Sequence, residues 1–254
     1  MGDNMDTYKF GDDTLIHSIG FNPYKIESIL TNGILSKNTA KNMGIPFARN
    51  YFGYNFDDNV SMTRPFYSNI EDPNSCLYTL GAKNVSVIVE GQEFIYDTKE
   101  AYYNHADEVF VSGMVPREKF VGLMVPEKYS EYELRDLPMI PLKSTSYLNI
   151  KETCDELIVY LSNMGHDADI EEYRELLREL HLTITELNKD RENSELEEDF
   201  FDVKLALNEF MAEEVQQTFD SVLGEGTTAL EMVSYLNNKT LELPIYGISK
   251  QITK

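Results

Sequence analysis

Short hydrophobic runs separated by turn residues mark the first half of this 254-residue chain. Residues 14–21 (TLIHSIGF) form an apolar run of strand length, and residues 84–90 (NVSVIVE) alternate in a segment rich in valine and isoleucine. Similar patterns predict three further strands, at residues 59–64, 108–113 and 120–125. The pattern of the first half therefore predicts a set of short strands.

One helix is predicted directly after the first strand. Asn22 suits the N-cap and Pro23 the first helical position, and Gly33 supplies a left-handed stop. Between them runs an apolar stripe at i, i+3 and i+4, formed by Ile26, Ile29 and Leu30. A strand, a helix and then several short strands predict an α+β domain rather than a doubly wound parallel sheet.

The second half of the chain carries helical spacing of its apolar residues instead. Four segments show it, and we predict helices over residues 152–163, 170–188, 200–223 and 228–237. The expected architecture is therefore an α+β domain followed by an all-α part, in which the helices form a bundle.

The composition changes where the pattern changes. Residues 1–148 carry 13 basic and 20 acidic side chains, a net charge of −7, whereas residues 149–254 carry 9 and 24, a net charge of −15. Eight of the nine prolines also precede Leu148. We place the boundary between two domains, residues 1–145 and residues 146–254, in this region.

The overall composition narrows the possible functions. Hydrophobic residues make up 42% of the chain and aromatic residues 11%, which indicates a globular protein. The net charge of −22 argues against binding to nucleic acid or to anionic lipid, because both need clustered basic side chains. Two cysteines fit a reducing compartment, no signal peptide is recognisable, and no apolar run approaches the roughly 18 residues of a membrane span. We expect a soluble, cytoplasmic protein.

Several candidate residues follow one another in a suggestive order. His17 lies inside the first predicted strand, and the predicted helix ends in residues 28–35 (SILTNGIL). A tyrosine-rich stretch then precedes the strand of residues 60–64 (VSMTR), and residues 108–125 (EVFVSGMVPREKFVGLMV) begin with Glu108. The histidines and cysteines show no metal-ligand spacing, so we expect no metal.

In this order the residues resemble the ADP-ribosyltransferase superfamily. The resemblance is to the His-Tyr-Glu group typified by diphtheria toxin and to the DNA-modifying toxin branch, and it covers residues 14–128, about half of the chain. It implies a split β-sheet domain that uses NAD as co-substrate. It also implies a toxin-like or effector-like protein that acts in the cytoplasm, its own or that of a host.

The resemblance assigns Glu108 as the catalytic residue. Cleavage of the bond between ribose and nicotinamide passes through an oxocarbenium-like centre, as at a glycosidic carbon. A carboxylate held beside the ribose stabilises that developing charge. The alternative for Glu108 is an ordinary solvated glutamate at the edge of a strand.

Three aromatic residues are candidates for binding the nicotinamide half of NAD. His17 would hydrogen-bond the ribose or the amide through one ring nitrogen, and its alternative is a buried core histidine. Tyr51 and Tyr54 could present a ring face on which nicotinamide stacks, although most of the 16 tyrosines must be structural. Ser18 follows His17 where the family commonly has glycine.

Polar residues of the strand at 60–64 are candidates for the rest of the dinucleotide. Ser61 and Thr63 point to one face of that strand and could hydrogen-bond the ribose. Arg64 is the candidate partner of the pyrophosphate, with Arg49 as the second choice, and its alternative is a surface charge.

The acceptor of ADP-ribose is less defined. Ala106 stands two residues before Glu108, where enzymes of this family that modify arginine or asparagine have a polar residue, so those acceptors are not expected. Residues 102–105 form the loop expected to face the acceptor, or an ordinary polar turn. We predict a mono-ADP-ribosyltransferase that acts on a protein or another macromolecule. The alternatives are an inactive relative used for binding, an NAD glycohydrolase, or an acidic interaction or inhibitor protein.

Overall fold

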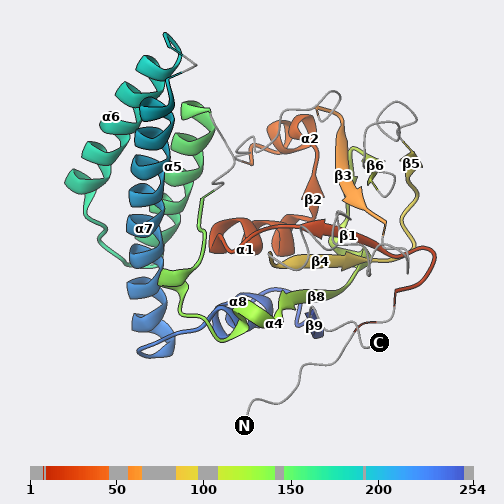
Figure 1. The fold of residues 1–254 in the computed structure, drawn as a ribbon. Coiled ribbons are helices and arrows are strands. Elements are labelled where there is room, and N and C mark those ends of the chain that lie inside the picture. The colour runs from red at the N-terminus through yellow and green to blue at the C-terminus, as the bar shows by residue number, and fades with distance from the viewer. Residues whose placement is uncertain are drawn as a thin grey trace, which may run out of the picture. The chain divides into compact units, whose positions relative to one another are not determined.

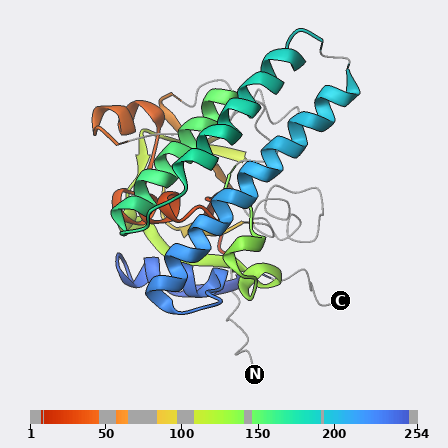
Figure 2. The same ribbon diagram turned by 90° about the vertical axis from the view of Figure 1, so that its left-hand side faces the viewer.

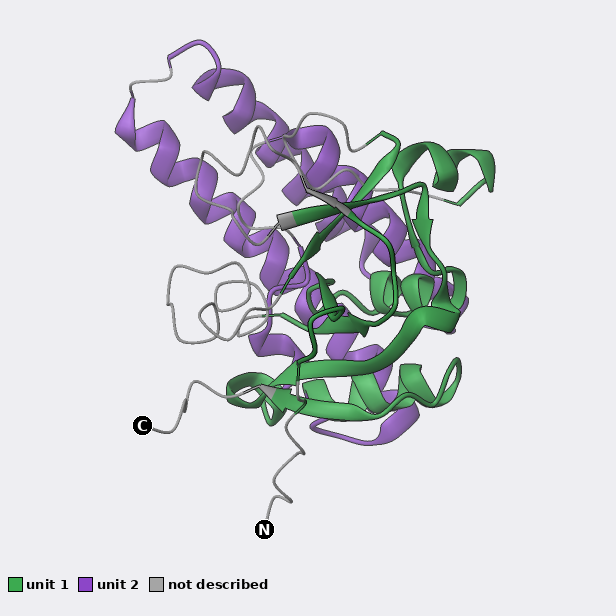
Figure 3. Cartoon of the chain, turned by 90° about the vertical axis from the view of Figure 1, so that its right-hand side faces the viewer, with its two compact units in different colours: residues 1–47, 53–132, 229–254 green, residues 48–52, 133–228 purple. Residues whose placement is uncertain are grey.

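The structure is a computed structural model of the chain, and it describes residues 8, 10–45, 57–64, 84–96, 108–140, 146–190 and 193–248. The chain divides into two compact units (Figure 3). Unit 1 comprises residues 1–47, 53–132 and 229–254, and unit 2 comprises residues 48–52 and 133–228. Unit 1 combines a mixed sheet with helices and unit 2 is helical where it is described, which confirms the predicted α+β class.

The main sheet of unit 1 has seven strands within the described residues, in the order β5-β6-β3-β1-β4-β8-β9. Neighbouring strands are antiparallel, except that β9 runs parallel to β8. The bounds are β1 Leu15–Ser18, β3 Asn59–Thr63, β4 Ser86–Val89, β5 Ile95–Tyr96, β6 Glu108–Ser112, β8 Phe120–Pro126 and β9 Ile245–Ile248. All five strands predicted from the sequence are confirmed.

The sheet consists of two parts that meet between β1 and β3. Strands β1 and β4 pair at four positions, whereas β1 and β3 pair only at Ile16 and Thr63. In Figure 1 the part formed by β3, β6 and β5 runs in a different direction from the part formed by β1, β4 and β8. A single pair thus joins the two parts, and the strands separate beyond it.

Helix α1 (Pro23–Asn32) forms where the sequence predicts it. The side chain of Asn22 accepts a hydrogen bond from the Lys25 N–H at 3.2 Å, and Ile26 and Leu30 are fully buried. Gly33 ends the helix with φ +86°, and a Cβ there would lie 2.5 Å from the Val115 carbonyl oxygen. The absence of a side chain therefore lets β2 (Ile34–Leu35) pair with β7 (Met114–Val115) as a separate two-stranded sheet.

Three short helices were not predicted among the described residues of unit 1. They are α2 (Lys37–Asn42), the 3₁₀ turn Arg117–Lys119 and α4 (Glu127–Ser130). The hydroxyl of Ser36 caps α2 by accepting from the Thr39 N–H at 3.3 Å. Helices this short show too few residues for a 3.6-residue period to be visible in the sequence.

The end of the chain returns to unit 1, which corrects the predicted domain of residues 146–254. Helix α8 (Ala229–Asn238) forms as predicted, but the segment after it pairs with β8 as β9. The side chain of Asn237 fixes the turn between them, since it donates to the Leu243 carbonyl at 2.7 Å and accepts from the Leu243 N–H at 3.0 Å. At Gly122 of β8 a Cβ would lie 2.6 Å from the Tyr246 ring, so glycine leaves room for β9.

Unit 2 is built on helices α5 (Tyr147–Asn163), α6 (Ile170–Leu187) and α7 (Ser194–Leu223) (Figure 2). A polar side chain caps each start, namely Ser146, Asp169 and Asn193. Helix α5 begins five residues before its prediction because the Ser146 cap and the fully buried Ile150 extend it. Among the helices that the structure describes, none has both the length and the apolar character needed to cross a bilayer.

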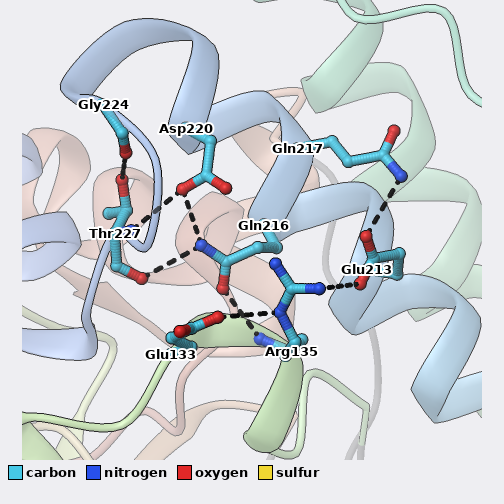
Figure 4. A network of polar contacts seen from close by, with 8 residues as sticks. All are labelled: Glu133, Arg135, Glu213, Gln216, Gln217, Asp220, Gly224 and Thr227. Atoms are coloured by element: carbon cyan, nitrogen blue, oxygen red, sulfur yellow. Dashed lines mark hydrogen bonds and ion pairs between the residues drawn. The ribbon is translucent and has the colours of Figure 1, made fainter.

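A polar network fixes one end of α7 (Figure 4). The fully buried Gln216 accepts from the Arg135 N–H at 3.1 Å and donates to Asp220 at 2.7 Å. Burial raises the pKa of Asp220, but hydrogen bonds from Thr227 and Gln216 outweigh this and lower it overall. Arg135 further pairs with Glu133 and Glu213, at 2.9 and 3.2 Å. These contacts are structural, because they connect residues 133–135 and 227 to the helix.

Candidate functional site

His17 lies at the place where the two parts of the sheet separate. Its ring Nδ1 lies 2.9 Å from the Ser61 carbonyl oxygen on β3. A carbonyl can only accept, so Nδ1 carries the proton and Nε2 of the neutral ring is an acceptor. No residue in the described part of the chain hydrogen-bonds Nε2. The ring is thus oriented by the protein through one nitrogen and can accept a hydrogen bond through the other.

The hydrogen bond of His17 takes the place of a backbone contact. Ile16 and Thr63 are paired, and continued pairing would place Ser18 opposite Ser61, but the ladder ends before that position. The imidazole instead hydrogen-bonds the Ser61 carbonyl at the point where β3 turns away from β1. The histidine therefore stabilises the split itself, in addition to any role in binding.

Burial lowers the pKa of His17, and the hydrogen bond to Ser61 only partly opposes this. Since the pKa in the folded state lies below its unfolded value of about 6.5, the unfolded chain binds the proton more readily as the pH falls. His17 therefore favours the folded state fully above about pH 6.5 and progressively less below it.

We predict that the urea midpoint of unit 1 falls between pH 7 and pH 5, and that H17Q makes this fall shallower. The control is H181Q, which removes an exposed histidine of α6 and should follow the wild type. Equal pH slopes for H17Q and the wild type would contradict the assignment of a neutral, partly buried imidazole.

Glu108 is the first residue of β6 and is described by its backbone alone. Its backbone pairs with Thr63, which in turn pairs with Ile16. Because neighbouring strands lie about 4.8 Å apart, two strand spacings of about 10 Å separate Glu108 from β1. The pairing therefore puts Glu108 in one row with Thr63 and Ile16. His17 lies one residue further along β1, where alternation turns its side chain to the opposite face of that strand from Ile16.

Ser61 and Thr63 differ in how much of each is accessible. Both lie on β3, and alternation along the strand puts them on the same face, as the sequence predicts. Thr63 is buried, with 8% of its surface exposed, whereas Ser61 is only partly buried. Ser61 is therefore the better placed of the two hydroxyls to reach a ligand.

Arg64 is held by the protein at the end of β3. One guanidinium nitrogen donates to the Asp12 carbonyl at 3.2 Å, and the group lies over the Phe94 ring, 5.6 Å from its centre. A cation that already contacts a carbonyl and an aromatic ring is less available to a pyrophosphate than a free side chain would be. The remaining predicted residues lie outside the described residues, namely Arg49, Tyr51, Tyr54, the loop of residues 102–105 and Ala106.

An aromatic cluster that the sequence analysis missed covers the other part of the sheet. The Tyr8 ring packs edge-on against Phe10 and Tyr246, with ring centres 5.4 and 5.0 Å away. These rings lie on a core formed by Ile16, Ile88 and Met124. Tyr8 also donates to the Glu90 carboxylate, and burial together with Glu90 raises the pKa of its hydroxyl. The alternation of Tyr8 and Phe10 is the one signal that could have revealed it.

The described residues contain no group of three or more histidine, cysteine, aspartate or glutamate side chains placed to hold a metal ion. No protein-family model matches this chain, and neither a curated protein nor a solved structure matches it.

Proposed function

We propose that this protein is an NAD-dependent mono-ADP-ribosyltransferase whose reaction takes place on unit 1. The observation that carries the proposal is the placement of His17 at the split between β1 and β3, with Glu108 across β3 at the start of β6. Two residues that are 91 positions apart in the sequence thereby lie two strands apart.

The arrangement of the sheet supports the proposal as well. The resemblance implies a split sheet, and the main sheet has two parts joined by one residue pair. The strand that carries Glu108, β6, is separated from β1 by β3 alone. If His17 and Glu108 had unrelated roles, nothing would require their strands to be separated by β3 alone.

The residues would divide the chemistry as follows. The neutral ring of His17 would accept a hydrogen bond through Nε2 from the ribose or from the nicotinamide amide, and the Ser61 hydroxyl on β3 would hydrogen-bond the ribose. The carbon–nitrogen bond to nicotinamide breaks, and its electron pair leaves with nicotinamide. The Glu108 carboxylate stabilises the positive ribose carbon that forms. A nucleophile of the acceptor then bonds to that carbon and loses its proton to water.

The acceptor in this proposal is a protein or another macromolecule. The formal net charge of −22 disfavours nucleic acid, because its phosphates would be repelled. Ala106, in place of a polar residue, disfavours arginine and asparagine side chains as acceptors.

Incubation with NAD labelled in its adenylate part tests the proposal, with candidate proteins, duplex DNA or single-stranded DNA supplied as acceptors. Transfer of label to a macromolecule with release of nicotinamide is the expected result. Release of free ADP-ribose alone would assign an NAD glycohydrolase instead. Binding of NAD without nicotinamide release would assign an inactive relative. If NAD were not bound and no nicotinamide were released, the proposal would be refuted.

A further inference from the structure

One face of α7 in unit 2 presents an apolar pair among carboxylates. Phe201 and Leu205 are exposed by 59% and 48%, although both are large hydrophobic side chains. Their spacing places them on one helical face. Three exposed acidic residues share that face at i, i+4 and i+11, namely Glu198, Asp202 and Glu209. We call these three residues together with the apolar pair the acidic stripe.

Two buried residues of the same helix hold the Phe201 ring in its exposed position. Phe200 and Lys204 on the inner side of α7 are buried, each with 2% of its surface exposed. The Phe200 ring lies 5.7 Å from the Phe201 ring, and the Lys204 ammonium lies 5.4 Å from the centre of that ring. An aromatic side chain fixed in this way loses little entropy on binding, which is what an anchor of an interface requires.

The charges around this pair have one sign. From Ser194 to Glu209 the exposed charged residues of α7 are all acidic, and Lys204, the one cation of this stretch, is buried. None of the three stripe carboxylates forms an ion pair with the described part of the chain. They are therefore available to a cationic partner and repel an anionic one.

We propose that the acidic stripe docks a basic segment of another protein, which places an apolar side chain against Phe201 and Leu205 between its lysine or arginine residues. A second copy of this chain would bring like charges together, and an anionic membrane or a nucleic acid would be repelled. The apolar pair supplies contact area at the centre, and the carboxylates supply the orientation and the rate of association.

Binding of two synthetic peptides to the full-length protein tests the proposal. The first is an 18-residue amphipathic peptide with a leucine stripe flanked by lysines, and the second replaces every leucine with alanine. Fluorescence anisotropy in low salt should show at least tenfold tighter binding of the leucine peptide. Equal affinities, or no binding of the leucine peptide, would overturn the proposal, because the apolar pair would then contribute nothing.

Variants locate the site. F201S and L205S should each weaken binding of the leucine peptide about tenfold, whereas V159S, which alters an equally exposed residue of α5, should change it less than twofold.

The triple variant E198Q/D202N/E209Q should weaken binding and flatten its salt dependence. Its control, E172Q/E175Q/E179Q on α6, removes the same charge. Equal effects of the two triple variants would show attraction to net charge alone and overturn the proposal. Circular dichroism confirms that each variant is folded.

Discussion

The variant E108Q is expected to cleave NAD at least about a hundredfold more slowly than the wild type. Glutamine keeps the shape of the side chain but removes the charge that would stabilise the oxocarbenium-like carbon, and one well-placed group of this kind contributes about a hundredfold or more to the rate. The first position of β6 holds this residue by a ladder to β3, so the fold should be unchanged. Release of labelled nicotinamide under saturating NAD measures the effect.

The matched control for this variant is E93Q. Glu93 is an exposed glutamate of unit 1 and precedes β5, so its replacement removes one negative charge without touching β6 or β3. We expect E93Q to retain the wild-type rate within twofold. If E108Q cleaved NAD at a near-normal rate, Glu108 would be an ordinary strand residue, and the transferase assignment would lose its catalytic group.

The second large effect is expected on stability: N208L should lower the free energy of unfolding of unit 2 by about 3 kcal/mol. Asn208 is buried on α7, and its Oδ1 accepts from the Met139 and Ile140 N–H groups at 2.9 and 3.3 Å. Its Nδ2 donates to the Leu137 carbonyl at 3.4 Å. Leucine fills a similar volume but removes the side-chain oxygen that accepts from these two backbone N–H groups, and a lost buried hydrogen bond of this kind costs about 1–3 kcal/mol.

Urea unfolding followed by circular dichroism at 222 nm measures this loss, because unit 2 is helical where it is described and α7 is its longest helix there. The control is N163L at the exposed end of α5, which makes the same substitution where no backbone group depends on it. A change within about 0.5 kcal/mol is expected there. Equal stabilities of N208L and N163L would show that residues 137–140 are held by other contacts.

The sequence determined those elements whose signals are local. The cap at Asn22, the stripe that follows it and the stop at Gly33 specify α1 completely, and the structure has it between Pro23 and Asn32. The helices of unit 2 follow from their period and their caps for the same reason, since a helix is stabilised by contacts within a few residues. Helix α5 was predicted too short because the Ser146 cap precedes the first clear apolar repeat.

The candidate site was predicted only in part. The order of residue types singled out His17, Ser61, Thr63 and Glu108 as candidates and placed them on strands. The structure confirms the strands, and the roles of these residues stay predictions. The sequence did not indicate that Arg64 is held by Asp12 and Phe94, or that the ring of His17 binds the Ser61 carbonyl. These contacts join residues 30 to 52 positions apart, and no local pattern encodes them.

Strand pairing is what only the tertiary structure decided. The sequence does not reveal that β3 leaves β1 after one residue pair, or that the last strand, Ile245–Ile248, returns to pair with β8. A strand carries only a period of two and unpaired backbone groups, which fit any neighbour of suitable register. Its partner is selected by residues far away in the chain. Gly122 of β8, for example, has no side chain and so leaves room for Tyr246 of β9. Local signals thus fixed the elements, and long-range packing decided which of them meet.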